Sequence, residues 1–236
     1  MLMIVAGTLD GYPQGVLWAV ALALGYGVAF VGGVSGFRIH AGHFAERHGL
    51  VVIIALGESI AAAGVGVSGL ALGTGVIAAV VVGIALAAAL WWAYFDLVML
   101  TAEHRLSAAQ GEERGRLARD SYSYLHLPMV AGIIFVALGV KQTLSHVGDP
   151  LGTIPAVALC GGVALYLLGH NGFRLRSVGS VSVPRLVVTM LCLALIPLAA
   201  SIPSLITLVV LALLLCGLAA FETGSSREFR REFRAR

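Results

Sequence analysis

Most of this chain consists of apolar stretches long enough to cross a lipid bilayer. A transmembrane α-helix needs about 20 predominantly apolar residues, and the sequence holds about seven such windows. They cover residues 16–36, 49–67, 75–100, 122–144, 153–171, 186–201 and 204–221. Because a backbone in lipid must satisfy its own hydrogen bonds, these windows predict an all-α fold, a polytopic transmembrane helical bundle. Only 11% of the residues are charged, against roughly 25% in soluble domains, which excludes an ordinary soluble protein.

The basic residues predict the orientation of this bundle. All but one of the 15 lysines and arginines lie in the segments that follow the first, third, fifth and seventh windows, and the exception is Lys141. The positive-inside rule places those segments in the cytoplasm. We therefore expect an N-terminus outside, a cytoplasmic C-terminus, a transmembrane domain over residues 1–222 and a basic cytoplasmic tail over residues 223–236. The net charge of +3 then reflects topology, so we expect the lipid bilayer as a partner and no nucleic acid.

The second window carries an ionisable residue, Glu58, at its centre. A charged side chain at mid-bilayer costs on the order of 3 kcal/mol on insertion scales. The neighbours Ala61, Ala62 and Gly66 are small, which lets another helix come close on that side. Glu58 is therefore a candidate site for a proton or a small cation. The alternative is a structural glutamate that fastens two helices by hydrogen bonds.

Two further polar residues are predicted at the cytoplasmic ends of neighbouring windows. Asp96 lies near the end of the third window, one turn after Trp92, and Tyr122 and His126 lie one turn apart near the start of the fourth. The similar depth predicts that Asp96 and His126 meet, and a carboxylate that orients an imidazole can carry a proton or bind a cation. Pro128 leaves an alternative, in which the helix begins beside this proline and His126 lies at the interface. Structural and functional roles both fit this pair.

Polar side chains also cluster before the second window, at His40, His43, Glu46 and His48. Their spacing is irregular for one coordination sphere, so we expect no metal site there. Glu46 and Arg47 are better interpreted as an ionic anchor that fixes where the helix enters the membrane.

Three blocks of the sequence together resemble the bacterial low temperature requirement A family. The first is HFAERHGLVVIIALGES at residues 43–59, in which a His-x-x-Glu-Arg run enters an apolar helix that ends in Leu-Gly-Glu. The second and third are WWAYFD at 91–96 and YLHLPMVAG at 124–132. The family pattern contains a further N-terminal half with a Glu-Leu-Phe-Phe-Asp-Leu block, which this chain lacks. The resemblance therefore implies a chain without the N-terminal part of the pattern, and a missing half or a second copy as a candidate partner.

The sequence leaves three hypotheses for function. The first is a proton- or cation-coupled transporter or channel-like protein of the plasma membrane that uses Glu58, with Asp96, His126 and Tyr122 as further site candidates. The second is a membrane-structural or cold-stress adaptation protein whose polar residues only hold helices together. The third is an intramembrane enzyme that acts on lipid. No nucleophile and base constellation, phosphate loop or dinucleotide fingerprint is present, so we expect no enzymatic activity and no cofactor.

Overall fold

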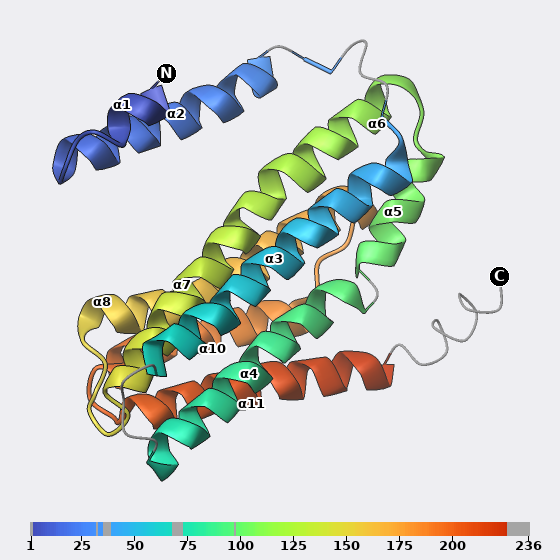
Figure 1. Cartoon of the computed structure of the whole chain (residues 1–236). Helices are drawn as coiled ribbons and strands as arrows, with labels where there is room; N and C mark the ends of the chain where they lie inside the picture. The colour runs from blue at the N-terminus through green and yellow to red at the C-terminus, as the bar shows by residue number, and fades with distance from the viewer. Residues whose placement is uncertain (1, 32, 35–38, 68–72, 97, 226–236) are drawn as a thin grey trace.

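The computed structural model describes residues 2–31, 33–34, 39–67, 73–96 and 98–225, and the regular elements in these ranges are helices (Figure 1). The N-terminal half contains α1 (Leu2–Ala6), α2 (Tyr12–Val31), α3 (Ala41–Val67), α4 (Thr74–Phe95), α5 (Val98–Ala108) and α6 (Gly111–Leu117). The C-terminal half contains the π-helix η1 (Ala118–Tyr124), α7 (Leu125–Ser145), α8 (Thr153–Ala156), the π-helix η2 (Val157–Gly161), α9 (Gly162–Val178), α10 (Val183–Ala199) and α11 (Ser204–Ser225).

Five helical segments are long and apolar enough to cross a membrane. They are Ala41–Gly66, Thr74–Ala108, Gly111–Ser145, Thr153–Val178 and Ser204–Ser225, and α10 is a shorter apolar helix. The prediction of an all-α polytopic membrane protein is thus confirmed. The first expected span, residues 16–36, lies largely on α2, which is peripheral and contacts the bundle where Tyr124 donates a hydrogen bond of 2.6 Å to the Tyr26 carbonyl. The count of seven spans and the orientation of the termini stay predictions, and the tail from residue 226 lies outside the described residues.

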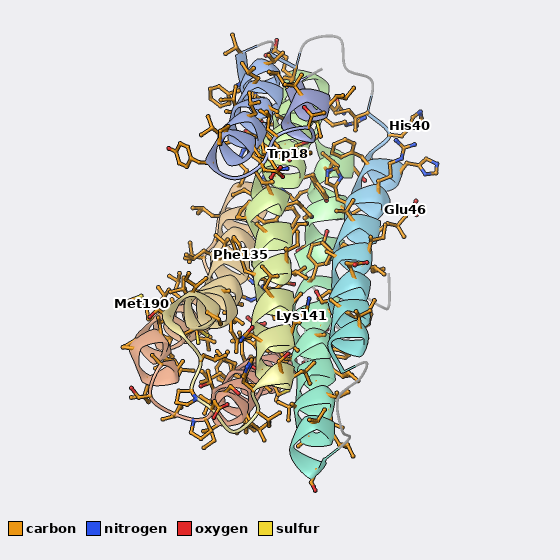
Figure 2. All side chains as sticks on the ribbon, turned by 60° about the vertical axis from the view of Figure 1, so that its left-hand side comes forward. Trp18, His40, Glu46, Phe135, Lys141 and Met190 are labelled. Carbon is orange, nitrogen blue, oxygen red and sulfur yellow. The ribbon has the colours of Figure 1, made fainter. Side chains whose placement is uncertain are left out.

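Helix α7 is the centre of the bundle, packed between α3 on one side and α9 on the other (Figure 1). Helix α11 lies along α4, and α10 packs on α9 and α11. Buried side chains from all six of these helices and from η1 form one core, in which Tyr94, Tyr122, Tyr166 and Phe173 are the largest. Many apolar side chains on the outer surface are exposed, among them Phe135 and Met190 (Figure 2). A surface of this kind is typical of a protein surrounded by lipid.

The closest helix packing in the bundle is between α7 and the continuous helical segment formed by η2 and α9, and glycine makes it possible. A Cβ built on Gly132 would lie 2.6 Å from the Gly162 carbonyl oxygen, and one on Gly139 would lie 2.8 Å from the Cα of Leu159. Both distances are shorter than van der Waals contact, so only glycine lets the two backbones approach this closely. Membrane helices pack through small residues in this way, because lipid supplies little hydrophobic driving force between them.

A π-helical turn allows the helix to begin well before Pro128. The chain is helical from Gly111 to Ser145, and the π-turn η1 precedes the proline, so that the Leu125 N–H donates to the carbonyl of Asp120, five residues earlier. His126 therefore lies inside a continuous helix and is only 4% exposed, so the alternative in which the helix begins beside Pro128 is wrong. Between the third and fourth windows the chain forms α5 and α6, and in α6 Arg116 pairs with Glu112 at 3.0 Å.

The predicted orientation can be tested by labelling introduced cysteines. Gly148 and Ser107 are both exposed and lie in segments on opposite sides of the predicted membrane. In a chain without its three native cysteines, we expect Gly148→Cys to react with an impermeant maleimide in intact cells. Ser107→Cys should react only after the cells are opened. Labelling of Ser107→Cys in intact cells would show that the orientation is reversed.

Candidate functional site

Glu58 lies on the outer surface of the bundle, in an open groove between α3 and α7. Its side chain is exposed, and in the described part of the chain no hydrogen bond or ion pair reaches its carboxyl group. The groove has a volume of about 430 Å³. Its lining is apolar except for Glu58, Ser59 and Lys141. Small side chains of both helices, including Ala62 and Ala137, keep the groove open.

Lys141 lies at the far end of the same groove, toward the end of α7 that is remote from His40 and Glu46 (Figure 2). Its aliphatic stem crosses to α3, where a Cβ on Gly66 would be 3.4 Å from the lysine Cγ. Gly66 is eight residues beyond Glu58, which is about 12 Å along the helix axis at 1.5 Å per residue. The two charged groups therefore share one groove at different depths.

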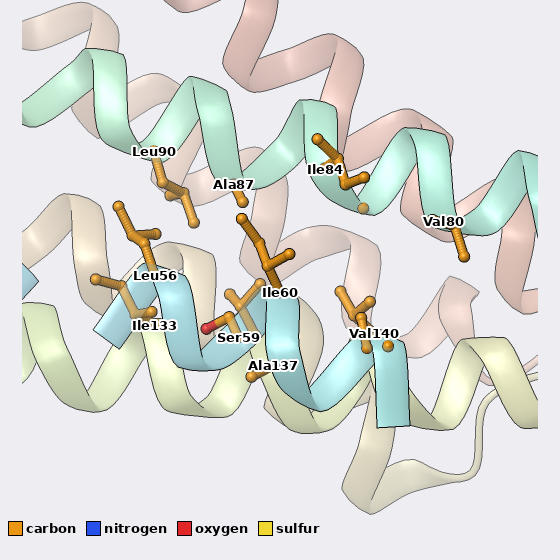
Figure 3. Close-up of a pocket in the computed structure, with 14 residues that line it drawn as sticks. Leu56, Ser59, Ile60, Val80, Ile84, Ala87, Leu90, Ile133, Ala137 and Val140 are labelled. Carbon is orange, nitrogen blue, oxygen red and sulfur yellow. The ribbon is translucent and has the colours of Figure 1, made fainter. Parts of the chain in front are cut away.

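A second, smaller cavity lies on the other side of α3, enclosed by α3, α4 and α7 (Figure 3). Its volume is about 160 Å³, and it shares Ser59 and Ala137 with the groove. Figure 3 shows aliphatic side chains around it, including Leu56, Ile60 and Ile84. The hydroxyl of Ser59 donates a hydrogen bond of 2.9 Å to the Ala55 carbonyl of its own helix. The cavity is therefore apolar and offers no charged group to a ligand.

The predicted site residue His126 is part of a buried hydrogen-bonded cluster in the core. Its Nδ1 lies 3.1 Å from the Ser121 carbonyl oxygen, and its Nε2 lies 2.7 Å from the Tyr94 hydroxyl. A carbonyl oxygen only accepts, so Nδ1 carries the proton and Nε2 accepts from Tyr94. Tyr122 stacks on the imidazole with ring centroids 5.4 Å apart, and His48 meets it edge to face at 5.1 Å.

A buried arginine, Arg185 of α10, forms the other half of this cluster. It is 3% exposed and makes a bidentate pair with Glu222 of α11, with Nε at 2.7 Å and Nη2 at 2.8 Å from the carboxylate oxygens. Its Nη2 also donates to the Ala93 carbonyl of α4 at 3.1 Å, and its Nη1 donates to Nδ1 of His170 in α9. One guanidinium thus joins four helices. We call Tyr94, Tyr122, His126, His170, Arg185 and Glu222 the buried polar cluster.

His170 connects the two halves of the buried polar cluster. Because Arg185 donates to its Nδ1, the neutral ring carries its proton on Nε2. That nitrogen is fully buried and has no hydrogen-bond partner among the described residues. The ring of Tyr94 lies edge to face with the imidazole at a centroid distance of 5.7 Å, which gives the buried N–H an aromatic neighbour. The hydroxyl of Tyr122 is likewise buried without a partner in the described part of the chain.

The remaining predicted residues lie at the ends of helices. Glu46 and Arg47 are exposed in the first turns of α3, and Glu46 pairs with His43 at 3.3 Å. Trp92 donates a hydrogen bond of 3.1 Å to the hydroxyl of Thr223 and so links α4 to α11. Asp96 is half-buried where α4 ends, and its backbone N–H donates to the Trp92 carbonyl. The pairing of Asp96 with His126 and the anchor role of Glu46 and Arg47 stay predictions.

Sequence reasoning missed the second half of the buried polar cluster. In the sequence, Arg185 is one of the basic residues after the fifth window that predict the orientation, and Glu222 lies at the boundary of the predicted tail. A usable signal was present, because α10 and α11 form an antiparallel pair. The start of one helix then lies at the same depth as the end of the next, which brings Arg185 to Glu222.

Comparison with known proteins assigns the family. The model of the family described as "Bacterial low temperature requirement A protein (LtrA)" matches residues 1–220. A relative from Rhizobium meliloti (strain 1021), described as "Uncharacterized protein RA0937", is 32% identical over 176 residues, which are 70% of this chain and 42% of the relative. The match thus spans about two fifths of that relative's length. No solved structure matches. This multi-pass membrane protein therefore belongs to the bacterial low temperature requirement A family.

Proposed function

We propose that this protein is a proton- or cation-coupled transporter or channel-like protein of the plasma membrane, with Glu58 as its titratable site. The observation that carries the proposal is the position of the carboxyl group. It lies in an open groove on the membrane-facing side of α3, without a hydrogen bond or ion pair from the described residues.

The physical argument is the free-energy cost of leaving an unpaired carboxyl group in the hydrocarbon of the membrane. Intramembrane carboxyl groups are expensive to insert and are typical of proton relays and ion pathways. Glu58 lies nine residues before the end of α3, which corresponds to about 13 Å of helix. A carboxylate at this depth is stabilised when it binds a proton, a cation or water that enters through the groove. A group that exchanges such a ligand is what coupled transport requires.

The test is the conservative substitution Glu58→Gln, which keeps the size and hydrogen-bonding capacity of the side chain and removes its titration. We expect Glu58→Gln to be produced and folded like the parent protein. It should abolish the pH-dependent flux that the parent shows in proteoliposomes with a proton dye and a series of monovalent cations. Ser59→Ala is the matched control, because it removes a neighbouring groove hydroxyl that is already bonded within its own helix.

The second candidate, a membrane-structural or cold-stress adaptation protein, is supported by the buried polar cluster, in which Arg185 joins α4, α9, α10 and α11. This arrangement fastens helices and needs no transported ion. The two candidates differ in the expected behaviour of Glu58→Gln. Full pH-dependent flux in this variant, or no flux in the parent protein under any gradient, would leave the structural role as the better explanation.

A further inference from the structure

Lys141 is the one basic residue outside the segments predicted to be cytoplasmic, and nothing in the fold accounts for its charge. Its side chain is exposed in the groove between α3 and α7, and no anionic side chain pairs with it among the described residues. Glu58 lines the same groove, and no ion pair joins its carboxylate to Lys141 in the described part of the chain. An ammonium group held four residues before the end of α7 lies where lipid headgroups meet the hydrocarbon.

The groove below Lys141 has the dimensions of a lipid chain. Its lining on α3 extends from Val51 to Ala62. Eleven residues correspond to about 16 Å at 1.5 Å per residue. The hydrocarbon core of a bilayer is about 30 Å thick, so the chains of one leaflet extend about 15 Å. An acyl chain therefore fits the groove over its full depth.

We propose that this groove is a binding site for a membrane phospholipid with an anionic headgroup. The phosphate pairs with the ammonium of Lys141, and one acyl chain lies in the groove against Val51, Ile54, Ile134 and Leu138. The charge is complementary at the level of the headgroup, and at the level of the chain the lining is apolar except for Glu58 and Ser59. Ala62 and Ala137 leave the space that the chain occupies. The predicted orientation assigns this lipid to the outer leaflet.

The chemistry of the site favours a lipid over a second copy of the chain. An identical groove in a partner would present its own Lys141 at the same depth, because a two-fold axis along the membrane normal preserves depth. Each lysine would then face the partner's apolar groove or the partner's lysine, and Glu58 would remain at a different depth from both. A phosphate neutralises the ammonium directly.

The proposal is tested by measuring which lipids stay bound to the purified protein. Nanodiscs would contain phosphatidylcholine with a minor share of phosphatidylglycerol, and the lipids retained after transfer to detergent are counted by native mass spectrometry. We expect the parent chain to retain phosphatidylglycerol preferentially. Lys141→Gln should lower that preference about five-fold, which is the contribution of one basic side chain at an anionic membrane surface. Ala62→Phe should reduce retention of both lipids, because the ring fills the chain groove.

Two controls make the result specific. Arg116→Gln removes a cation from the other end of the bundle and should leave retention unchanged. Lipid retention is measured without any ion gradient, so failure of the transport proposal is distinguishable from failure of this one. Soluble glycerol phosphate, a headgroup without chains, should not displace the lipid. Unchanged preference in Lys141→Gln would overturn the proposal, and so would a disulfide between two copies formed by Ala62→Cys, since it would place a second chain in the groove.

Discussion

Replacing Arg185 by methionine is expected to destabilise the protein by about 3 to 5 kcal/mol, the range for breaking a buried ion pair by removing one partner. The substitution keeps much of the side-chain volume and removes four hydrogen bonds at once, two of them to Glu222. Glu222 is then left as a largely buried carboxylate without its cation. The measurement is the loss of helical signal during titration of the detergent-solubilised protein with sodium dodecyl sulfate.

The matched control is Arg116→Met, which breaks the ion pair with Glu112 on the surface of α6. Both side chains of that pair are more than half exposed, and exposed pairs of this kind contribute about 0 to 1 kcal/mol. A second comparison is the double variant Arg185→Met with Glu222→Leu, which removes both charges. Replacement of a whole buried pair by apolar groups is often tolerated, so the double variant should be more stable than Arg185→Met alone. If Arg185→Met and Arg116→Met lowered the free energy of unfolding equally, the buried ion pair would not be what stabilises the bundle.

The ion pair also shows what the sequence could and could not predict. Apolar windows predicted the helices well, because length and hydropathy are properties of each segment alone. The partner of a polar residue depends on which helix faces which, and that order is set by packing. His126 was predicted to lie beside Asp96 near the start of the fourth window, and its observed hydrogen bonds to Tyr94 and Ser121 depend on a π-turn. No residue pattern before Pro128 predicts that π-turn.

For Glu58, the sequence predicted the neighbouring helix but not the exposure of the carboxyl group. The sequence predicted a helix approaching its small-residue side, and in the structure α7 packs on α3 while the carboxyl group itself faces the open groove. Periodicity alone identifies the residues that share a face with Glu58, but not whether that face is covered. The sequence also could not predict that Glu58 and Lys141 line one groove, because they lie on helices that are far apart in the chain. Their shared groove follows from the parallel packing of α3 on α7.

The second large effect is expected where α7 contacts the continuous segment formed by η2 and α9. Gly139→Ala should destabilise the bundle by about 1 to 3 kcal/mol or more, the range for overpacked cores, because the new methyl group would lie 2.8 Å from the Cα of Leu159. The obstacle is backbone, so a change of rotamer cannot relieve it. The helices must instead separate, which also loosens the neighbouring contact of Gly132 with Gly162. The same titration with sodium dodecyl sulfate measures the shift.

Gly217→Ala in α11 is the control for this substitution. Gly217 is exposed within its helix, and a Cβ there would meet nothing within 4 Å. It makes the same chemical change and gains helix propensity of up to about 1 kcal/mol, so it should leave stability unchanged or slightly higher. The difference between the two variants isolates the steric contribution of the contact between α7 and η2. If Gly139→Ala were as stable as Gly217→Ala, the two helices would have to lie farther apart than the structure places them, and glycine would not be what sets their distance.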